Sequence, residues 1–179
     1  IIMTIYCANT SWRHNREWWR SRGENGKWQW LIVDLDRGFN INNSNTNLVD
    51  NLKDDYELFQ YLLNSPFFVD RFVQRSAAHL SNTFFAERMN SIVDSLGSMI
   101  NLEMPRHIDR WGNEGGIPSM SNWESELDEI KQFVENRSTI VQNQIMDELN
   151  MEGTAEVIVN VQPQGAGKIL LNDVPIIHP

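Results

Sequence analysis

Hydrophobic and polar positions alternate in blocks along this chain, and most blocks have the spacing of α-helices. Apolar residues recur every three or four positions, which predicts amphipathic helices whose apolar stripes form a core rather than a cofactor groove. Ser65-Pro66 and a capping box from Ser121 to Glu124 mark two helix starts, Gly97 is a weak point, and glycines and a proline break the pattern at 113–118. The predicted helices cover residues 48–63, 66–80, 85–100 and 121–149.

The first third of the chain has a different pattern. Two aromatic-rich runs, 16–20 and 27–33, flank Gly23-Glu-Asn-Gly26, which predicts a β-hairpin. The apolar segment 1–8 before it indicates the end of a helix or a strand. Residues 9–15 form a polar loop, and 38–47, rich in Asn, Ser and Thr, predict a long mobile loop.

A second change of character follows Gly153. The β-type runs 155–161 and 168–171 surround a turn at 163–167, and they predict a linker and the first hairpin of a following β module. We therefore divide the chain into residues 1–150 and 151–179. Because it starts with Ile1 inside an apolar run, we expect it to be a fragment of a longer protein.

Composition narrows the function classes. The 179 residues are 41% hydrophobic, enough to bury a core, and the formal net charge of −9 argues against a nucleic-acid backbone as the main ligand. Cys7 is the single cysteine, so neither an intramolecular disulfide nor a cysteine-based zinc site is expected. No apolar run has the length of a membrane span. The compartment and the oligomeric state stay open.

The candidate chemistry lies where the second hairpin arm ends. Asp34 and Asp36 follow the apolar run 30–33 and precede Gly38. Carboxylates two residues apart at a strand end project to the same side, so they are able to share a hard cation such as Mg²⁺. The alternative is an Asp pair that only caps a turn.

Three blocks of sequence then carry a family resemblance. Tyr6-Cys-Ala-Asn-Thr-Ser-Trp-Arg-His-Asn15, Trp18-Trp19-Arg20 and the block from Gly26 to Phe39 resemble the spore-coat protein H (CotH) kinase family. That family has an Asn-x-Asp-Trp-Pro-x-Asn-type loop, then a hairpin ending in Asp-x-Asp-x-x-Phe. Downstream, Leu62-Leu63-Asn64-Ser-Pro-Phe67 and a helix with Phe133-x-x-x-Arg137 agree, so the resemblance covers residues 1 to about 150.

The resemblance implies a fold and an activity. The fold is mainly α with β-hairpins, the helical C-lobe-like part of an atypical protein-kinase-like fold, followed by the start of a β module. The activity is transfer of phosphate from ATP, with Mg or Mn, to Ser or Thr of a protein substrate. By the same resemblance Asp34 binds the metal, Asn15 binds metal or orders the loop, and Asp36 is a support or second ligand. A bacterial spore coat or another cell-surface location is implied as well.

One departure from the family pattern bears on catalysis. Ser11 stands where the family has the loop Asp that would act as catalytic base, and a hydroxyl is not a useful base near neutral pH. Arg13 and Arg16 replace further residues of the pattern. The nucleotide-gripping part of such folds, with its ion-paired Lys, lies upstream, and Lys27 is more simply a solvated residue. We therefore expect this polypeptide alone to bind ATP weakly or not at all.

Two alternatives remain open. The chain is either an impaired kinase portion or a catalytically decayed scaffold that serves interactions in a multidomain surface protein. A carbohydrate-binding surface is the rival from another class, because four of the seven Trp residues lie on one predicted hairpin. If that hairpin covers a helical layer, about half of them face the core. Those four are Trp18, Trp19, Trp28 and Trp30.

Overall fold

The computed structural model describes residues 1–160, 162–163 and 167–177. Its described part is mainly α-helical with two small antiparallel hairpins, which confirms the predicted fold class. The helices are α1 (Ile2–Tyr6), the 3-10 turn η1 (Ile41–Asn43), α2 (Leu48–Asp55), α3 (Glu57–Leu63), α4 (Pro66–Ala78), the π-helical turn η2 (His79–Thr83), α5 (Ala86–Ile100), α6 (Met104–Trp111) and α7 (Met120–Glu148). The strands are β1 (Glu17–Trp19), β2 (Gln29–Leu31), β3 (Leu170–Leu171) and β4 (Val174–Pro175).

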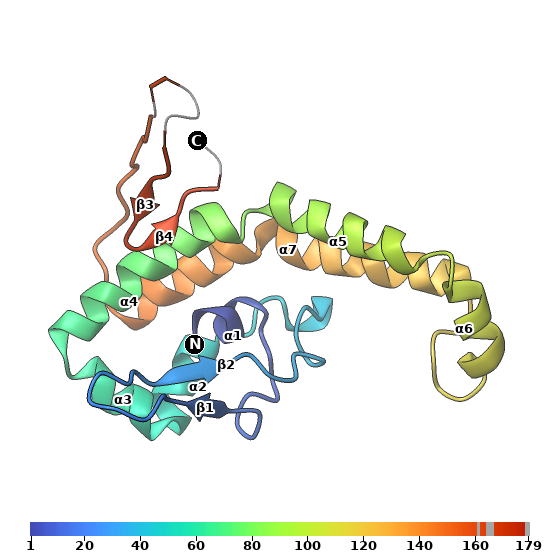
Figure 1. The fold of residues 1–179 in the computed structure, drawn as a ribbon, viewed down its shortest axis with the longest axis horizontal. Helices are drawn as coiled ribbons and strands as arrows, with labels where there is room; N and C mark the ends of the chain where they lie inside the picture. The colour runs from blue at the N-terminus through green and yellow to red at the C-terminus, as the bar shows by residue number, and fades with distance from the viewer. Residues whose placement is uncertain (161, 164–166, 178–179) are drawn as a thin grey trace.

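The long helix α7 organises the molecule (Figure 1). Its C-terminal half lies beside α4, and its N-terminal half runs next to α5 as an arm that ends at α6. The segments α1, β1, β2, α2 and α3 lie together on the other side of α7. The main apolar core sits where α1, α2 and α4 meet α7, and includes Tyr6, Leu52, Phe72 and Val141. Outer positions of α5, such as Leu96 and Ile100, are exposed, so the predicted stripe of α5 is only partly core.

A buried arginine joins the N-terminal segments to α7. Arg137 is 0% exposed, and its guanidinium donates hydrogen bonds to the carbonyl oxygens of Ile5, Tyr6, Ser44 and Thr46 at 2.6, 2.8, 2.6 and 3.2 Å. A buried charge is tolerated when hydrogen bonds satisfy it, and these carbonyls include the C-terminal end of α1. Arg137 thereby also orders part of the loop that the sequence predicted to be mobile.

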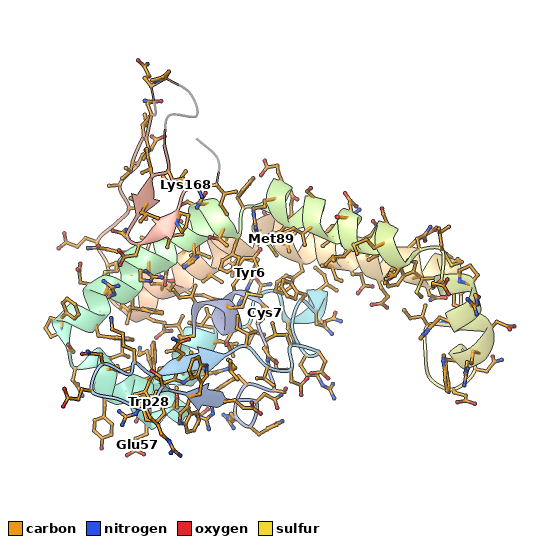
Figure 2. The ribbon with its side chains drawn as sticks, viewed as in Figure 1. Tyr6, Cys7, Trp28, Glu57, Met89 and Lys168 are labelled. Atoms are coloured by element: carbon orange, nitrogen blue, oxygen red, sulfur yellow. The ribbon has the colours of Figure 1, made fainter. Side chains whose placement is uncertain are left out.

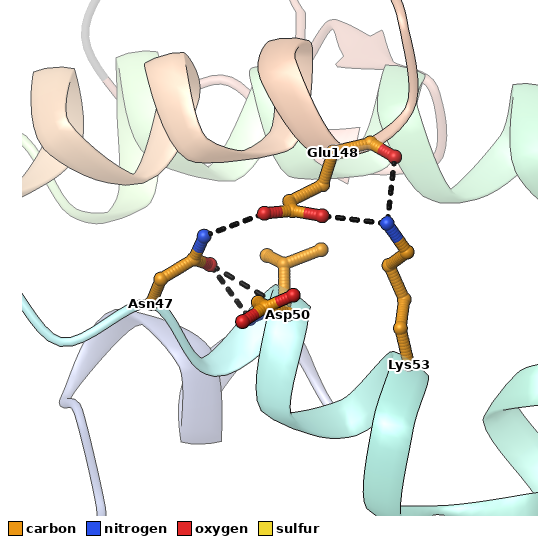
Figure 3. Close-up of polar contacts among 5 residues, drawn as sticks. Asn47, Asp50, Lys53 and Glu148 are labelled. Atoms are coloured by element: carbon orange, nitrogen blue, oxygen red, sulfur yellow. Dashed lines mark hydrogen bonds and ion pairs between the residues drawn. The ribbon is translucent and has the colours of Figure 1, made fainter.

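A second polar contact ties α2 to the end of α7 (Figure 3). Lys53 Nζ lies 2.6 Å from Glu148 Oε2 and donates to the Glu148 carbonyl at 3.2 Å. Asn47, the N-cap of α2, donates from Nδ2 to Glu148 Oε1 at 2.9 Å while its Oδ1 accepts from the amides of Val49 and Asp50. Glu148 therefore connects both ends of α2 to α7.

Three helix boundaries differ from the prediction. Residues 48–63 form two helices, because Tyr56 has an extended backbone (φ −122°, ψ 93°) that places its ring 5.8 Å from that of Trp12. The last long helix is capped by Ser119, whose Oγ accepts from the amide of Asn122 at 3.2 Å, so the capping box at Ser121 was wrong. Helix α6 was not predicted, since it has only eight residues.

The C-terminal hairpin also differs. Leu170 and Leu171 pair with Pro175 and Val174, not with the run 155–161, whose described residues 155–160 contain no strand. The predicted turn at 163–167 lies partly outside the described residues. Asn172 and Asp173 have positive φ values, as a two-residue hairpin turn requires, and Asp173 lies 2.7 Å from Arg71 of α4. The division of the chain at residue 150 remains a prediction.

Candidate functional site

A polar loop after α1 supplies the first half of the site. Asn9 is 2% exposed, and its Oδ1 accepts the backbone N–H of Ser11 at 3.1 Å. Its Nδ2 donates to the backbone carbonyl of Asp34 at 3.1 Å. A single buried amide thus joins the loop to the end of the β1–β2 hairpin.

Asn15 completes a second bridge between the same two segments. Its side-chain Nδ2 donates to Ser11 Oγ at 2.9 Å and to Asp34 Oδ2 at 3.0 Å. Three of the residues predicted from sequence, Ser11, Asn15 and Asp34, therefore form one contiguous network. Their chemical roles remain predictions, because geometry alone assigns none of them.

Asp34 has an unusual backbone. Its φ of 50° lies in the left-handed region, where Asp is better tolerated than most non-glycine residues. Backbone strain of this kind persists only where the surroundings hold it, and here both Asn9 and Asn15 bind Asp34. The carboxylate is held at the outer end of the network, on an exposed residue.

The segment after Asp34 is fixed against α1. The amide of Gly38 donates to the carbonyl of Leu35 at 2.8 Å, which closes a turn, and the amide of Phe39 donates to the Cys7 carbonyl at 2.8 Å. A Cβ at Gly38 would lie 3.2 Å from the Cβ of Cys7, so a side chain here would press on α1. Phe39 then packs its ring 5.6 Å from that of Phe133.

Asp36 lies apart from this network. It is exposed, and its Oδ2 lies 3.9 Å from Nε of its neighbour Arg37. Within the described part of the chain there is no group of three or more His, Cys, Asp or Glu side chains arranged to hold a metal ion. The oxygen donors that the network offers to a cation are the Asp34 carboxylate and the Asn15 amide oxygen.

That donor pair fits Mg²⁺ or Mn²⁺ in one respect. Mg²⁺ is commonly bound through one or two carboxylates, with waters and substrate phosphates completing its shell. Since Nδ2 of Asn15 is used in hydrogen bonds, its Oδ1 is the atom with the chemistry of a metal ligand. When bound, a cation of this kind neutralises phosphate charge.

A hollow of about 280 Å³ adjoins the network and is lined in part by residues of β2 and the segment after it. Asn9 and Asn15 line it together with Trp12, Trp30 and Leu35. Arg16 also lines it, with its guanidinium 5.5 Å from the Trp12 ring and 4.7 Å from the Tyr56 ring. The site is thus a polar network beside an aromatic wall.

Burial shifts the pKa values of two residues that support the site, Cys7 and Arg137. It raises the pKa of the Cys7 thiol to about 11 and lowers the pKa of Arg137 to about 10. Near neutral pH Cys7 is therefore neutral, and Arg137 is charged. The positive charge that supports α1 is compensated by carbonyl dipoles.

The chain matches a known protein family over most of its length. Residues 1–141 match the family model described as CotH kinase protein. The chain belongs to the CotH kinase family. No curated protein and no solved structure matches it. The match covers α1 through most of α7, and so includes Ser11, Asn15, Asp34 and Arg137.

Asn9 and Arg137 hold this CotH-family site together, but their roles were not predicted from the sequence. Asn9 begins the Asn-x-Ser-Trp loop, and Arg137 ends the Phe-x-x-x-Arg motif, so both stood inside quoted motifs. Arg13 and Arg16, which depart from the family pattern, have their partners outside the hydrogen-bond network: Arg13 pairs with Asp55, and Arg16 stacks on Tyr56. Among the described helices of this CotH-family chain, none combines the length and hydrophobicity needed to cross a bilayer.

Proposed function

We propose that this chain carries the metal-holding part of a phosphotransferase site that uses ATP with Mg or Mn and acts on Ser or Thr hydroxyls of a protein. Membership of the CotH kinase family supports the class of reaction. The main support for placing the metal site at these residues is that Asn15 hydrogen-bonds both Ser11 and Asp34. Phosphoryl transfer depends chiefly on positioning and charge neutralisation, and a hydrogen-bonded Asn15–Asp34 pair that holds a cation would contribute to both.

Each residue of the network has a distinct role in this proposal. Asp34 supplies the carboxylate for the cation, and Asn15 supplies an amide oxygen while its Nδ2 keeps the Asp34 side chain in place. Asp36 lies beside Arg37 and contributes to the charge of the turn. Ser11 occupies the place of the proton acceptor, where its hydroxyl accepts a hydrogen bond from Asn15.

The serine implies slow turnover. A positioned general base contributes roughly 10²- to 10⁴-fold to the rate of such reactions, and a serine hydroxyl does not supply it near neutral pH. We therefore propose an enzyme whose metal-binding half is intact and whose proton-accepting half is weakened.

The test follows the fate of the γ-phosphate of ATP. Because residues 1–179 alone are expected to bind ATP weakly, the full-length protein is incubated with γ-labelled ATP, Mg²⁺ or Mn²⁺ and casein as acceptor. Mn²⁺ binding is measured in parallel by electron paramagnetic resonance. We expect labelling that requires the cation and that is lost, together with tight Mn²⁺ binding, in Asp34→Ala. Asp109→Ala, an exposed carboxylate on α6, is the matched control and should behave as wild type. Equal labelling by Asp34→Ala, or Mn²⁺ affinity that is unchanged in Asp34→Ala, would contradict the proposal.

A second candidate function is favoured by Ser11 alone. A CotH-family domain without its general base is also able to serve as a scaffold that binds partners without chemistry. In that case the wild-type protein transfers no phosphate, whether or not Mn²⁺ binds at Asp34. The same experiment therefore separates the two candidates.

A further inference from the structure

The β1–β2 hairpin has two different faces. In its register Trp18 pairs with Trp30, and Trp19 pairs with Gln29. Because side chains alternate along a strand, Trp18, Trp28 and Trp30 lie on one face and Trp19 lies on the other. About half of the four Trp residues were expected to face the core if the hairpin covered a helical layer, but all four are exposed, at 54, 47, 53 and 50% in chain order.

The three-Trp face borders a groove. The groove has a volume of about 630 Å³ and lies between that face and the corner at which α2 meets α3. Figure 2 shows Trp28 and Glu57 at this corner of the molecule. Besides the three Trp rings, its lining includes Tyr56, Asp55 and Glu57. The volume lies in the usual range of small-molecule sites.

Arginine side chains hold two of the aromatic rings. The guanidinium of Arg16, itself part of the lining, lies 4.7 Å from the centre of the Tyr56 ring. The guanidinium of Arg20 lies 5.2 Å from that of Trp28. Cation–π contacts of this kind are modestly attractive at exposed sites, so they favour the ring positions seen here. The groove therefore combines held aromatic faces with charged hydrogen-bonding groups at its rim.

We propose that this groove binds a neutral, β-1,4-linked glucan segment. In such a chain all ring hydroxyls are equatorial, so both flat faces of each sugar present C–H groups to an indole ring. The hydroxyls at the edges need hydrogen-bond acceptors and donors, which Glu57 and Arg16 supply, together with the remaining lone pairs of Asp55, whose carboxylate is paired with Arg13. Held aromatic rings bind with little loss of conformational freedom.

Charge argues against two other occupants. The charged residues that line the groove, Arg16, Asp55 and Glu57, are of both signs, and Asp55 is paired with Arg13, so the groove is not a strong anion site. The formal net charge of −9 also opposes an anionic polymer. A purely apolar protein segment would cover the Glu57 carboxylate and the Arg16 guanidinium without giving them hydrogen-bond partners, which costs free energy. A neutral ligand with many hydroxyls satisfies both the rings and the rim.

The experiment uses cellohexaose as the probe and needs no phosphate transfer. Isothermal titration and the indole N–H signals in NMR spectra report binding, and maltohexaose, with its α-linked curved chain, is the comparison sugar. We expect cellohexaose to bind more tightly than maltohexaose and to shift the signals of Trp18, Trp28 and Trp30 more than that of Trp19. Trp18→Ala should weaken binding about tenfold, as loss of one aromatic contact implies.

Trp19→Ala is the matched control, because it removes an equally exposed indole from the opposite face of the same hairpin. It should leave cellohexaose binding unchanged. No binding of cellohexaose at millimolar concentration would overturn the proposal. So would an equal loss of binding in Trp19→Ala, or indole shifts that appear only with apolar peptides. The wild-type spectra decide the question even if a Trp variant fails to fold.

Discussion

The side-chain amide of Asn9 donates to the backbone carbonyl of Asp34 at 3.1 Å, while its oxygen accepts the amide of Ser11. This buried side chain holds the candidate base position and the candidate metal ligand in one frame. Arg137 supports this frame by binding the carbonyls of Ile5 and Tyr6 at the end of α1, three to four residues before the loop begins at Asn9. Site geometry in this chain thus depends on residues that need not touch a substrate.

Asn9→Leu should disturb Asp34 without removing it. The change leaves the Asp34 carbonyl and the Ser11 amide without their partner, which costs about 1–3 kcal/mol of stability. We expect the three-bond HN–Hα coupling of Asp34 to leave the value for a φ of 50° and Mn²⁺ affinity to fall. Asn42→Leu, at an exposed position in η1, is the control. An unchanged Asp34 coupling in Asn9→Leu would show that Asn9 does not position this residue.

Ser11→Asp should raise phosphate transfer. The substitution places a carboxylate beside Asn15, and a restored general base is expected to increase turnover by about 10²-fold or more. Thr10→Asp adds the same charge one residue away, at an exposed position, and should give no increase. If Ser11→Asp binds Mn²⁺ as wild type does but is no faster, then a missing base is not what limits this site.

Arg137→Lys should destabilise the fold nearly as much as Arg137→Met. A lysine ammonium has three donors at one point, and it does not reproduce the planar fork that reaches four carbonyls on two segments. We expect each variant to lose about 3–5 kcal/mol of unfolding free energy in urea titrations. Arg106→Met, at an exposed position on α6, should change it by less than about 0.5 kcal/mol. A mild effect of Arg137→Lys would mean that charge, not geometry, is what the carbonyls require.

The contact of Lys53 with Glu148 should show measurable coupling. Both side chains are partly buried, at 33 and 20% exposure, so solvent screens the pair less than it screens a surface ion pair. A double-mutant cycle with Lys53→Met and Glu148→Gln should give a coupling energy of about 1 kcal/mol. A cycle on Arg106 and Glu103, an exposed pair, should give a smaller value. Equal coupling in both cycles would contradict a special role for burial.

Stability should fall as pH rises above about 9. Burial raises the pKa of Cys7 from 9.0 to about 11, so the unfolded chain loses this proton first and binds fewer protons than the folded chain. The contribution is complete below pH 9 and is lost toward pH 11, at up to about 1.4 kcal/mol per pH unit. Burial raises the pKa of Tyr6 too, whereas the lowered pKa of Arg137 acts in the opposite direction above its own value.

Unfolding in urea between about pH 8 and pH 10 isolates the cysteine, because Tyr6 and Arg137 titrate mainly above this window. Cys7→Ala should remove most of the decline while changing the absolute stability little. A decline of the same slope in Cys7→Ala would assign it to another group.

The pattern of apolar residues was enough to predict the helical character, the β1–β2 hairpin and most helix ends. It was also enough to predict that Asp34 follows a strand end. These features are local, because periodicity, caps and turn residues act over a few positions along the chain. The association of Asp34 with the loop of Ser11 and Asn15 was implied only by the family resemblance.

What the sequence did not reveal depends on contacts between distant segments. Arg137 reaches Tyr6 across 131 positions, and Asn9 reaches Asp34 across 25, and neither spacing is visible in a linear pattern. The break at Tyr56 likewise follows from the packing of its ring on Trp12 and Arg16. Residues 1–141 by themselves determined the family, the helices and the candidate metal ligand. Only the tertiary structure decided how that ligand is held and which face of the hairpin borders a groove, because buried hydrogen bonds and ring packing exist only once the chain has folded.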